Sequence, residues 1–242
     1  MIILNLGCGT KTSDKADVIN IDWSIYLRVK QIKALVPIVP LLFRGERSIK
    51  FNSIPDNIFL HNLNKGIPFD ANSVDVVYHS HLLEHFDRER AEKFLVEIKR
   101  ILKPAGIHRI VVPDFEAICR AYIAHIESCE KNMPQAVNHD NYISEILEMS
   151  VRKNAYGTSK QKPVRRFVEN LILGDARRRG ETHQWAYDRF SLRAKLSRLG
   201  YKEVVIQKYN RSSVPNWDSY GLDVDENGNP HQPGSLFVEA SK

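Results

Sequence analysis

Short apolar segments typical of buried strands recur along the whole chain and alternate with helical or turn-forming sequence. This alternation predicts an α/β fold with a doubly wound, mostly parallel sheet. The chain has 242 residues, enough for one domain of ordinary size, so we expect a single domain over residues 1–242. The seven expected strands cover residues 2–6, 18–21, 58–60, 74–78, 107–112, 204–206 and 236–238.

Two helices of this domain are predicted from apolar residues at helical spacing. The first follows Asp87, a suitable N-cap, and Pro104 and Gly106 end it. The second covers Phe190 to Leu199, and Asp188 is its candidate N-cap.

Two longer segments interrupt the alternation. Residues 24–54 form an insertion after the second strand, and residues 115–182, which look largely helical, follow the fifth. Both begin after the carboxyl end of a strand, which is the edge where such sheets bind ligands. We therefore predict that residues 115–182 form a helical lid over a binding site.

The positive charge of the chain is concentrated in the second insertion. Residues 152–179 include nine Lys and Arg and two Asp and Glu, a net charge of +7, compared with +6 for the whole chain. Such a stretch either attracts an anionic partner or forms a solvated helical surface. The sequence leaves both interpretations open.

Segments that would direct the chain into a membrane are not expected. The longest apolar run, residues 32–43, is too short for a membrane span and contains Pro37 and Pro40. The three cysteines cannot form a disulfide framework, and no charged region precedes the first strand as in a secretory signal. We expect a cytoplasmic protein with reduced cysteines. The sequence is compatible with both a monomer and a homo-oligomer.

A glycine-containing turn, Gly7-Cys8-Gly9, follows the first strand directly. Glycines at this place let the backbone approach a ligand that a Cβ would exclude. Asp22 ends the second strand, and a carboxylate there can accept hydrogen bonds from both hydroxyls of a ribose. A dinucleotide fingerprint would need a third glycine where Thr12 stands and a longer spacing to the acid, so a dinucleotide is disfavoured.

Three further motifs follow in order, and together with this turn they carry a family resemblance. They are His61-Asn-Leu-Asn-Lys-Gly-Ile-Pro-Phe69, Ser73-Val-Asp-Val-Val-Tyr-His-Ser-His-Leu-Leu-Glu-His85 and Ile101-Leu-Lys-Pro-Ala-Gly106. The set resembles class I S-adenosylmethionine-dependent methyltransferases of the LNLGCG, SHVLEH and LKPGG type. The resemblance extends from about Ile3 to Pro113 and implies a Rossmann-like fold, with S-adenosyl-L-methionine as the cofactor.

The resemblance also implies which residues hold the cofactor. The glycine turn would pass under its methionine part, Asp22 would hold the ribose, Asn62 and Leu63 would lie beside the adenine, and His79 and Ser80 would line the sulfonium side. Asn5 and Asn62 replace acids that many relatives carry. The cofactor-binding candidates are Asn5, Gly7, Cys8, Gly9, Asp22, Trp23, Asn62, Leu63, His79 and Ser80.

His81-Leu82-Leu83-Glu84-His85 also matches the H-x-x-E-H signature of zinc peptidases. That signature should lie inside a long helix with a third ligand downstream, whereas here it follows a strand directly. We therefore expect no metal, local hydrogen bonding by Glu84 and His85, and no zinc hydrolase.

The candidates for the acceptor side come from two places. Asp114 follows the fifth strand, and His183 and Tyr187 precede the last helix. A histidine of near-neutral pKa suits the deprotonation of a hydroxyl, so His183 and Asp114 are the catalytic candidates. Tyr187, Arg165 and Arg166 are the acceptor-binding candidates, and a substrate rim is considered at Trp217, Asp218, Tyr220, Asp223 and Asp225.

The resemblance thus favours O-methylation of a sugar, glycan or other small acceptor, which would be anionic if the basic stretch faces the site. Members of the resembled group suggest polysaccharide biosynthesis, by analogy. A nucleic-acid methyltransferase is an alternative, but the basic stretch has few aromatic residues to stack on bases, so a nucleic-acid partner is not expected. A cofactor-binding protein that has lost transfer is the other alternative.

Overall fold

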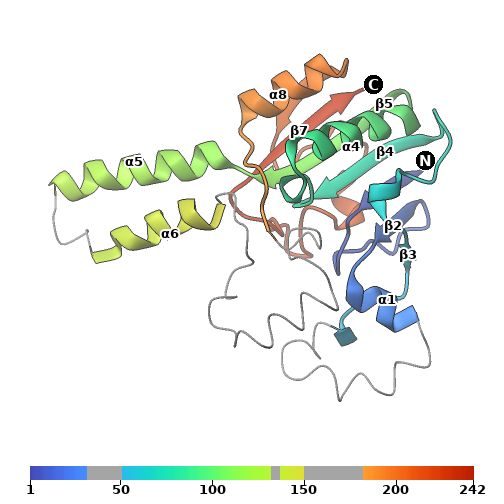
Figure 1. The fold of residues 1–242 in the computed structure, drawn as a ribbon, viewed down its shortest axis with the longest axis horizontal. Coiled ribbons are helices and arrows are strands. Elements are labelled where there is room, and N and C mark those ends of the chain that lie inside the picture. Colours follow the sequence, from blue (N-terminus) through green and yellow to red (C-terminus); the bar gives the residue numbers. More distant parts are fainter. Residues whose placement is uncertain (32–50, 132–136, 150–181) are drawn as a thin grey trace.

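The computed structural model describes residues 1–31, 51–131, 137–149 and 182–242. Its centre is one seven-stranded sheet with the order β3-β2-β1-β4-β5-β7-β6 (Figure 1). All neighbouring strands are parallel except β7, which is antiparallel to both β5 and β6. The predicted α/β fold with a mostly parallel sheet is confirmed. The strands are β1 (Ile3–Leu6), β2 (Val18–Asp22), β3 (Ile58–Leu60), β4 (Val74–Ser80), β5 (Leu102–Pro113), β6 (Lys202–Gln207) and β7 (Ser235–Ser241).

The helices lie on the two faces of the sheet, except α5 and α6, which project from the domain. The α-helices are α1 (Ile25–Gln31), α4 (Arg88–Ile101), α5 (Phe115–Lys131), α6 (His139–Met149) and α8 (Arg189–Arg198). The 3-10 helices are η2 (Leu63–Lys65), η3 (Leu83–His85) and η6 (Trp217–Tyr220). No described helix combines the length and the apolar composition that a bilayer-spanning segment requires.

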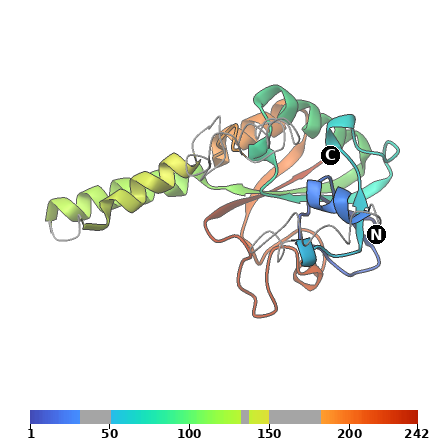
Figure 2. The same ribbon diagram turned by 60° about the horizontal axis from the view of Figure 1, so that its bottom comes forward.

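Helices α4 and α8 pack side by side on one face of the sheet (Figures 1 and 2). The apolar stripe of α4 is buried there together with Leu192 and Leu196 of α8. Both predicted N-caps are observed, since Asp87 Oδ1 accepts a hydrogen bond from the Arg90 N–H (2.8 Å) and Asp188 forms a capping box with Ser191.

The passage from α4 into β5 differs from the prediction. Helix α4 ends at Ile101 and β5 begins at once, so Pro104 and Gly106 lie inside the strand and not in a turn before it. The pairing jumps from Val74–Leu102 to Val76–Ile107, which leaves extra residues of β5 in a bulge. A bulge accommodates Pro104, which cannot donate to the sheet.

The other face of the sheet is covered by the C-terminal segment, residues 208–231, drawn in orange to red in Figure 2. Val214, Trp217 and Leu222 from this segment pack on Tyr78 and Phe237 of the sheet. The two layers place apolar cores on both sides of the parallel strands, as a doubly wound sheet requires.

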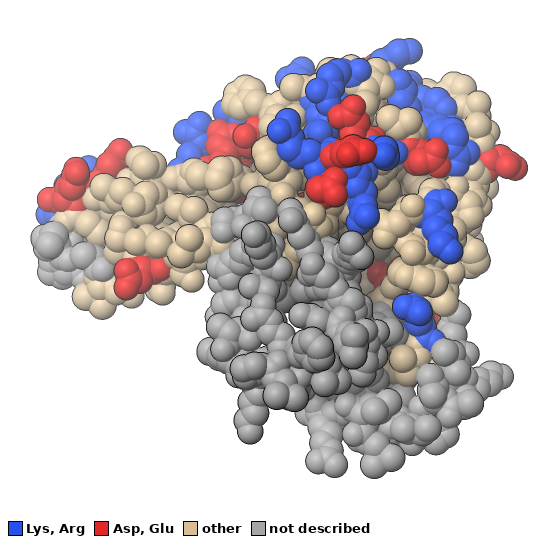
Figure 3. Space-filling model, in the orientation of Figure 1, with Lys and Arg blue, Asp and Glu red and all other residues tan. Residues whose placement is uncertain are grey.

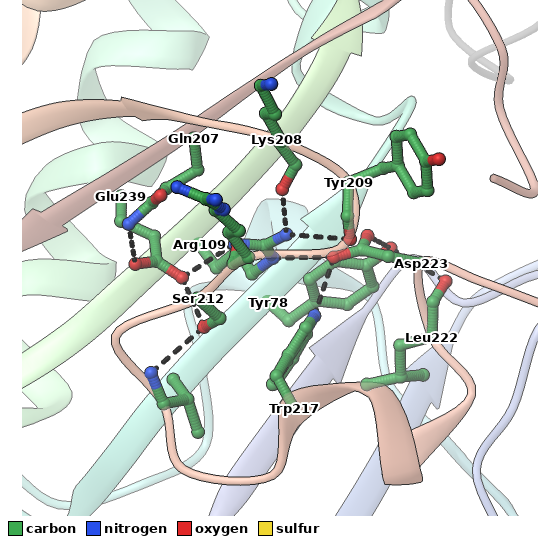
Figure 4. A network of polar contacts seen from close by, with 12 residues as sticks. Tyr78, Arg109, Gln207, Lys208, Tyr209, Ser212, Trp217, Leu222, Asp223 and Glu239 are labelled. Atoms are coloured by element: carbon green, nitrogen blue, oxygen red, sulfur yellow. Dashed lines mark hydrogen bonds and ion pairs between the residues drawn. The ribbon is translucent and has the colours of Figure 1, made fainter. Parts of the chain in front are cut away.

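Arg109 of β5 is the centre of a buried polar network under the C-terminal segment (Figure 4). Its side chain is fully buried, its Nε donates to Asp223 Oδ2 (2.6 Å) and its Nη1 to Glu239 Oε1 (2.7 Å). Trp217 Nε1 donates to the same Asp223 oxygen (2.6 Å), and the Tyr78 hydroxyl donates to the other (2.8 Å). Trp217 and Asp223 are therefore internal residues, and their assignment to a substrate rim is wrong.

Helices α5 and α6 form a hairpin that projects from the rest of the domain (Figures 1 and 2). No side chain of α5 is buried. These helices belong to the predicted lid, but they extend away from the sheet and do not cover its edge. Residues 132–136 and 150–181 of that lid, like residues 32–50 of the first insertion, lie outside the described residues.

Candidate active site

The predicted motifs meet at the carboxyl edge of the parallel strands. Gly7 follows β1 and donates its N–H to the Ile21 carbonyl of β2 (2.8 Å). His61 follows β3 and donates to the Asp22 carbonyl (3.1 Å), and His81 follows β4 and donates to the Val111 carbonyl of β5 (2.9 Å). Strand β1 lies between β2 and β4: the chain adds β2 and β3 on one side of β1 and then continues with β4 on the other side. Doubly wound sheets bind ligands at the carboxyl ends of the strands where the strand order reverses in this way.

The glycine turn has a backbone that only glycine adopts easily. Gly7 and Gly9 have φ angles of +66° and +57°. A Cβ on Gly7 would also lie 2.8 Å from Leu82 Cδ1, whereas a Cβ on Gly9 would meet nothing within 4 Å. Gly7 is thus fixed by packing, and Gly9 leaves open space next to the edge.

Asp22 holds this turn in place from the end of β2. One oxygen of its carboxylate accepts from the Gly9 N–H (2.8 Å) and the other from the Ser24 N–H (2.6 Å). Each oxygen retains a second lone pair for a ligand hydroxyl. Trp23 beside it is partly exposed, with the Arg28 guanidinium 4.9 Å from its ring centre.

Two residues of the cofactor set, Asn5 and Cys8, point into the protein. Asn5 is buried, and its Nδ2 donates to the Lys11 carbonyl and to Asn20 Oδ1 (both 2.9 Å). Cys8 packs in a small apolar cluster that includes Leu27, and burial raises the pKa of its thiol far above the usual range. Both side chains support the turn from behind.

Asn62 and Leu63 lie after β3, at the neighbouring position along the edge. Asn62 caps η2 by accepting from the Asn64 N–H at its Oδ1 (3.0 Å), and Leu63 packs against the main core. The Asn62 amide is therefore oriented by the turn that follows it.

His79 lies in the core rather than at the edge. Its side chain is fully buried, with its ring 5.5 Å from Phe94 of α4 and 5.1 Å from the ring of His108. Burial lowers its pKa to about 3, so the ring is neutral. A side chain under α4 does not line the cofactor, so we do not retain His79 as a ligand contact; Ser80, the next residue, ends β4 at the edge.

Glu84 is the centre of a buried cluster of titratable groups that the sequence did not predict. Its carboxyl is almost completely buried, and it has no hydrogen-bond partner among the described residues. His81 Nδ1 lies 3.6 Å and His85 Nε2 4.0 Å from its Oε1. Burial raises the pKa of Glu84 to about 8, so the carboxyl is mostly protonated at neutral pH. The only available sequence signal was the density of polar residues in the H-x-x-E-H segment, which occupies a turn and η3 rather than a long helix.

The histidines of this cluster connect the glycine turn with the acceptor-side residues. The His183 ring meets the His85 ring edge-on at 5.1 Å. Burial, followed by the charges of Lys11, His183 and His85, lowers the pKa of His81 to about 4. Because Lys11 follows the glycine turn, both that turn and His183 lie near enough to His81 for their charges to lower its pKa.

Lys11 is a second residue that the sequence analysis missed. Its ammonium group is enclosed, with no hydrogen-bond partner in the part of the chain that the structure describes. Burial lowers its pKa, and the charge of Asp223 opposes this effect. A buried cation beside the glycine turn is suited to an anionic group of a ligand.

Asp114 and Tyr187 lie side by side where β5 ends. They form an isolated parallel bridge, and the Phe115 N–H donates to the Tyr187 carbonyl (3.1 Å). Asp114 Oδ1 accepts from the Ala117 N–H in the first turn of α5 (3.2 Å). The Tyr187 side chain is buried, and burial, followed by the charge of Glu84, raises the pKa of its hydroxyl. Arg165 and Arg166 lie outside the described residues.

Part of the sequence matches one known protein family. Residues 44–110 match the family described as a methyltransferase domain, a stretch that begins after the glycine turn and ends in β5. Among curated proteins, none matches the sequence.

Two of the solved structures to which this chain is similar are methyltransferases by their descriptions. A SAM dependent methyltransferase from Archaeoglobus fulgidus is 15% identical, with 99% of this chain and 85% of that chain covered and a TM-score of 0.43. An S-adenosylmethionine dependent methyltransferase from Mesorhizobium loti is 14% identical, with 100% and 90% covered and a TM-score of 0.43.

Proposed function

We propose that this S-adenosylmethionine-dependent methyltransferase transfers its methyl group to a hydroxyl oxygen of a sugar, glycan or other small acceptor. The observation that carries the proposal is the continuity of the edge: an open glycine turn with Asp22 lies next to a cluster of Glu84, His85 and His183. One part suits the cofactor and the other suits removal of a hydroxyl proton.

The residues at the edge fit the cofactor. Gly9 leaves free space that a Cβ would fill, and Asp22 has lone pairs for the two ribose hydroxyls. Asn62 follows β3 at the position for an adenine contact, and Lys11 can pair with the carboxylate of the methionine part. When bound, S-adenosylmethionine supplies the electrophilic methyl group.

His183 is the group that we assign to the acceptor proton. A hydroxyl becomes a stronger nucleophile as it loses its proton, and a half-buried imidazole is a suitable base. His85 meets its ring edge-on, and one oxygen of the protonated Glu84 carboxyl lies within 4.8 Å of a ring nitrogen of both histidines. Alignment of the acceptor oxygen by such fixed groups can supply about 7–11 kcal/mol of the barrier.

The second part of the proposal concerns the chemical class of the acceptor. The charge of +7 over residues 152–179 favours an anionic sugar or glycan, with Arg165 and Arg166 as its partners. On the described surface in Figure 3, acids and bases intermix over α4 and α8, and Arg198 pairs there with Glu92 (2.6 Å). Such a mixed surface does not favour nucleic acid. The resemblance extends the proposal to polysaccharide biosynthesis, and the three cysteines without a disulfide framework extend it to a cytoplasmic enzyme.

Asp22→Ala is expected to weaken binding of S-adenosylhomocysteine by about 10–150-fold. The variant loses a charged acceptor for the ribose, worth about 1.5–3 kcal/mol, and releases the Gly9 N–H. Isothermal titration calorimetry measures the change. Asp70→Ala is the matched control, because Asp70 is exposed in the turn before β4, at the opposite edge. Wild-type affinity in Asp22→Ala would remove Asp22 from the site.

His183→Ala is expected to lower kcat by about 100–10,000-fold while the affinity for the cofactor stays unchanged. The assay measures release of S-adenosylhomocysteine with an acceptor found in a screen of neutral and anionic sugars. Added imidazole should restore part of the rate, because a free base can enter the space left by the side chain. An unchanged kcat would exclude His183 as the base, and absence of turnover by the wild type on every acceptor would favour a non-catalytic cofactor-binding protein.

A further inference from the structure

Among the described residues, the hairpin of α5 and α6 is joined mainly by side chains that are only partly buried, among them stacked rings. Helix α5 has 17 residues and none is buried, and Ile123 and Leu147 are about half exposed. An isolated helix of this length is marginally stable in water, because most helical stability in proteins comes from packing. A metal ion bound by both helices would add to the stability of such a hairpin.

Three metal-ligating side chains meet near the outer end of this hairpin. His125 and Cys129 are four residues apart on one face of α5, and His139 begins α6. One ligand atom from each lies within 4.8 Å of the other two. Cys129 Sγ and His125 Nε2 are 3.5 Å apart.

We propose that His125, Cys129 and His139 bind a zinc ion that joins α5 to α6. At usual Zn–N and Zn–S lengths, ligand atoms on a tetrahedral ion lie about 3.3–3.6 Å apart, which agrees with the Cys129–His125 distance. Thiolate and imidazole together favour zinc over the hard cations magnesium and calcium. Three protein ligands leave the fourth position for water or another donor.

The surroundings of the three ligands support a built site. The Tyr142 ring stacks on His125 with centres 4.1 Å apart, and the Tyr122 ring lies 5.5 Å from that of His139. Such contacts fix the imidazole planes, as outer-shell groups do at metal sites. His139 Nδ1 is buried and has no hydrogen-bond partner among the described residues.

This proposal departs from the expectation that the chain binds no metal. That expectation was argued from the segment from His81 to His85 alone, whereas the hairpin ligands come from two helices and form no sequence motif. Glu84, His85 and His183 form a second group within ligand distance, but they belong to the candidate active site. The test must therefore separate the two groups.

The experiment measures bound zinc in the tag-free full chain, purified without chelator and dialysed against zinc ion, by mass spectrometry of the metal. We expect about one zinc per chain in the wild type, with affinity reduced more than tenfold in Cys129→Ser and His139→Ala. Cys119→Ser is the matched control on the same helix and should keep the zinc. Cobalt substitution should give a thiolate-to-metal absorption band that Cys129→Ser abolishes and Cys119→Ser retains.

His139→Cys keeps a ligand at that position and should retain the zinc, which separates loss of a ligand from loss of folding. Wild-type protein without zinc after dialysis would overturn the proposal, as would zinc retained by both Cys129→Ser and His139→Ala. Zinc lost from Glu84→Gln but kept by Cys129→Ser would place the ion in the other group and also overturn it.

Discussion

Replacing Arg109 by methionine is expected to lower the free energy of unfolding by about 3–5 kcal/mol. The guanidinium is fully buried and pairs with both Asp223 and Glu239. Without it, two buried carboxylates lose their cation, and the Lys208 and Arg211 carbonyls lose a donor. Urea denaturation at neutral pH measures the loss, which corresponds to a fall in Tm of about 6–20 °C.

Arg193→Met is the control for this variant, since Arg193 is exposed on α8 and the side-chain change is the same. An exposed substitution of this kind changes stability by about 0.5 kcal/mol or less. A loss below about 1 kcal/mol in Arg109→Met would show that the C-terminal segment does not depend on the network. A buried ion pair replaced as a whole can be neutral, so removing Asp223 and Glu239 charges together with Arg109 should recover part of the loss.

Glu84→Gln is expected to gain stability relative to the wild type as the pH rises, by about 4 kcal/mol between pH 4.5 and 8. Burial raises the pKa of Glu84 from 4.5 to about 8. A carboxyl with a raised pKa in the folded state contributes its full stability below pH 4.5 and loses it as the pH rises through 8. Glutamine has no such titration, so the difference between the two proteins grows over this window.

The measurement is the unfolding free energy of both proteins at several pH values, taken as a difference so that the histidines cancel. Glu130→Gln, exposed on α5, controls for the loss of a carboxyl from the surface. A difference that stays constant from pH 5 to 8 would show that Glu84 is already ionised in the folded protein and paired with a neighbouring histidine.

The position of His79 shows a property that the sequence pattern does not predict, namely the face of the sheet on which a strand residue lies. Alternation along a strand tells which residues share a face but not which face that is. The pairing shift between Val74 and Val76 changes the alternation within β4, and it places Val77 in the core under α4 and Tyr78 in the core under the C-terminal segment. His79 consequently faces Phe94 in the core, whereas the strand-end position alone predicts a side chain at the edge.

The sequence by itself determined the features that depend on neighbours along the chain. The caps at Asp87 and Asp188, the turn at Gly7 and Gly9 and the strands β1 to β4 follow from contacts within a few residues, which local patterns encode.

Only the tertiary structure decided the features that join distant segments. Arg109 meets Asp223 and Glu239 across more than one hundred residues, and β7 enters the sheet antiparallel between β5 and β6. The cluster around Glu84 and the ligands of the hairpin likewise come from separate elements. Their energies depend on burial and on distances between side chains, and these quantities exist only once the elements have packed.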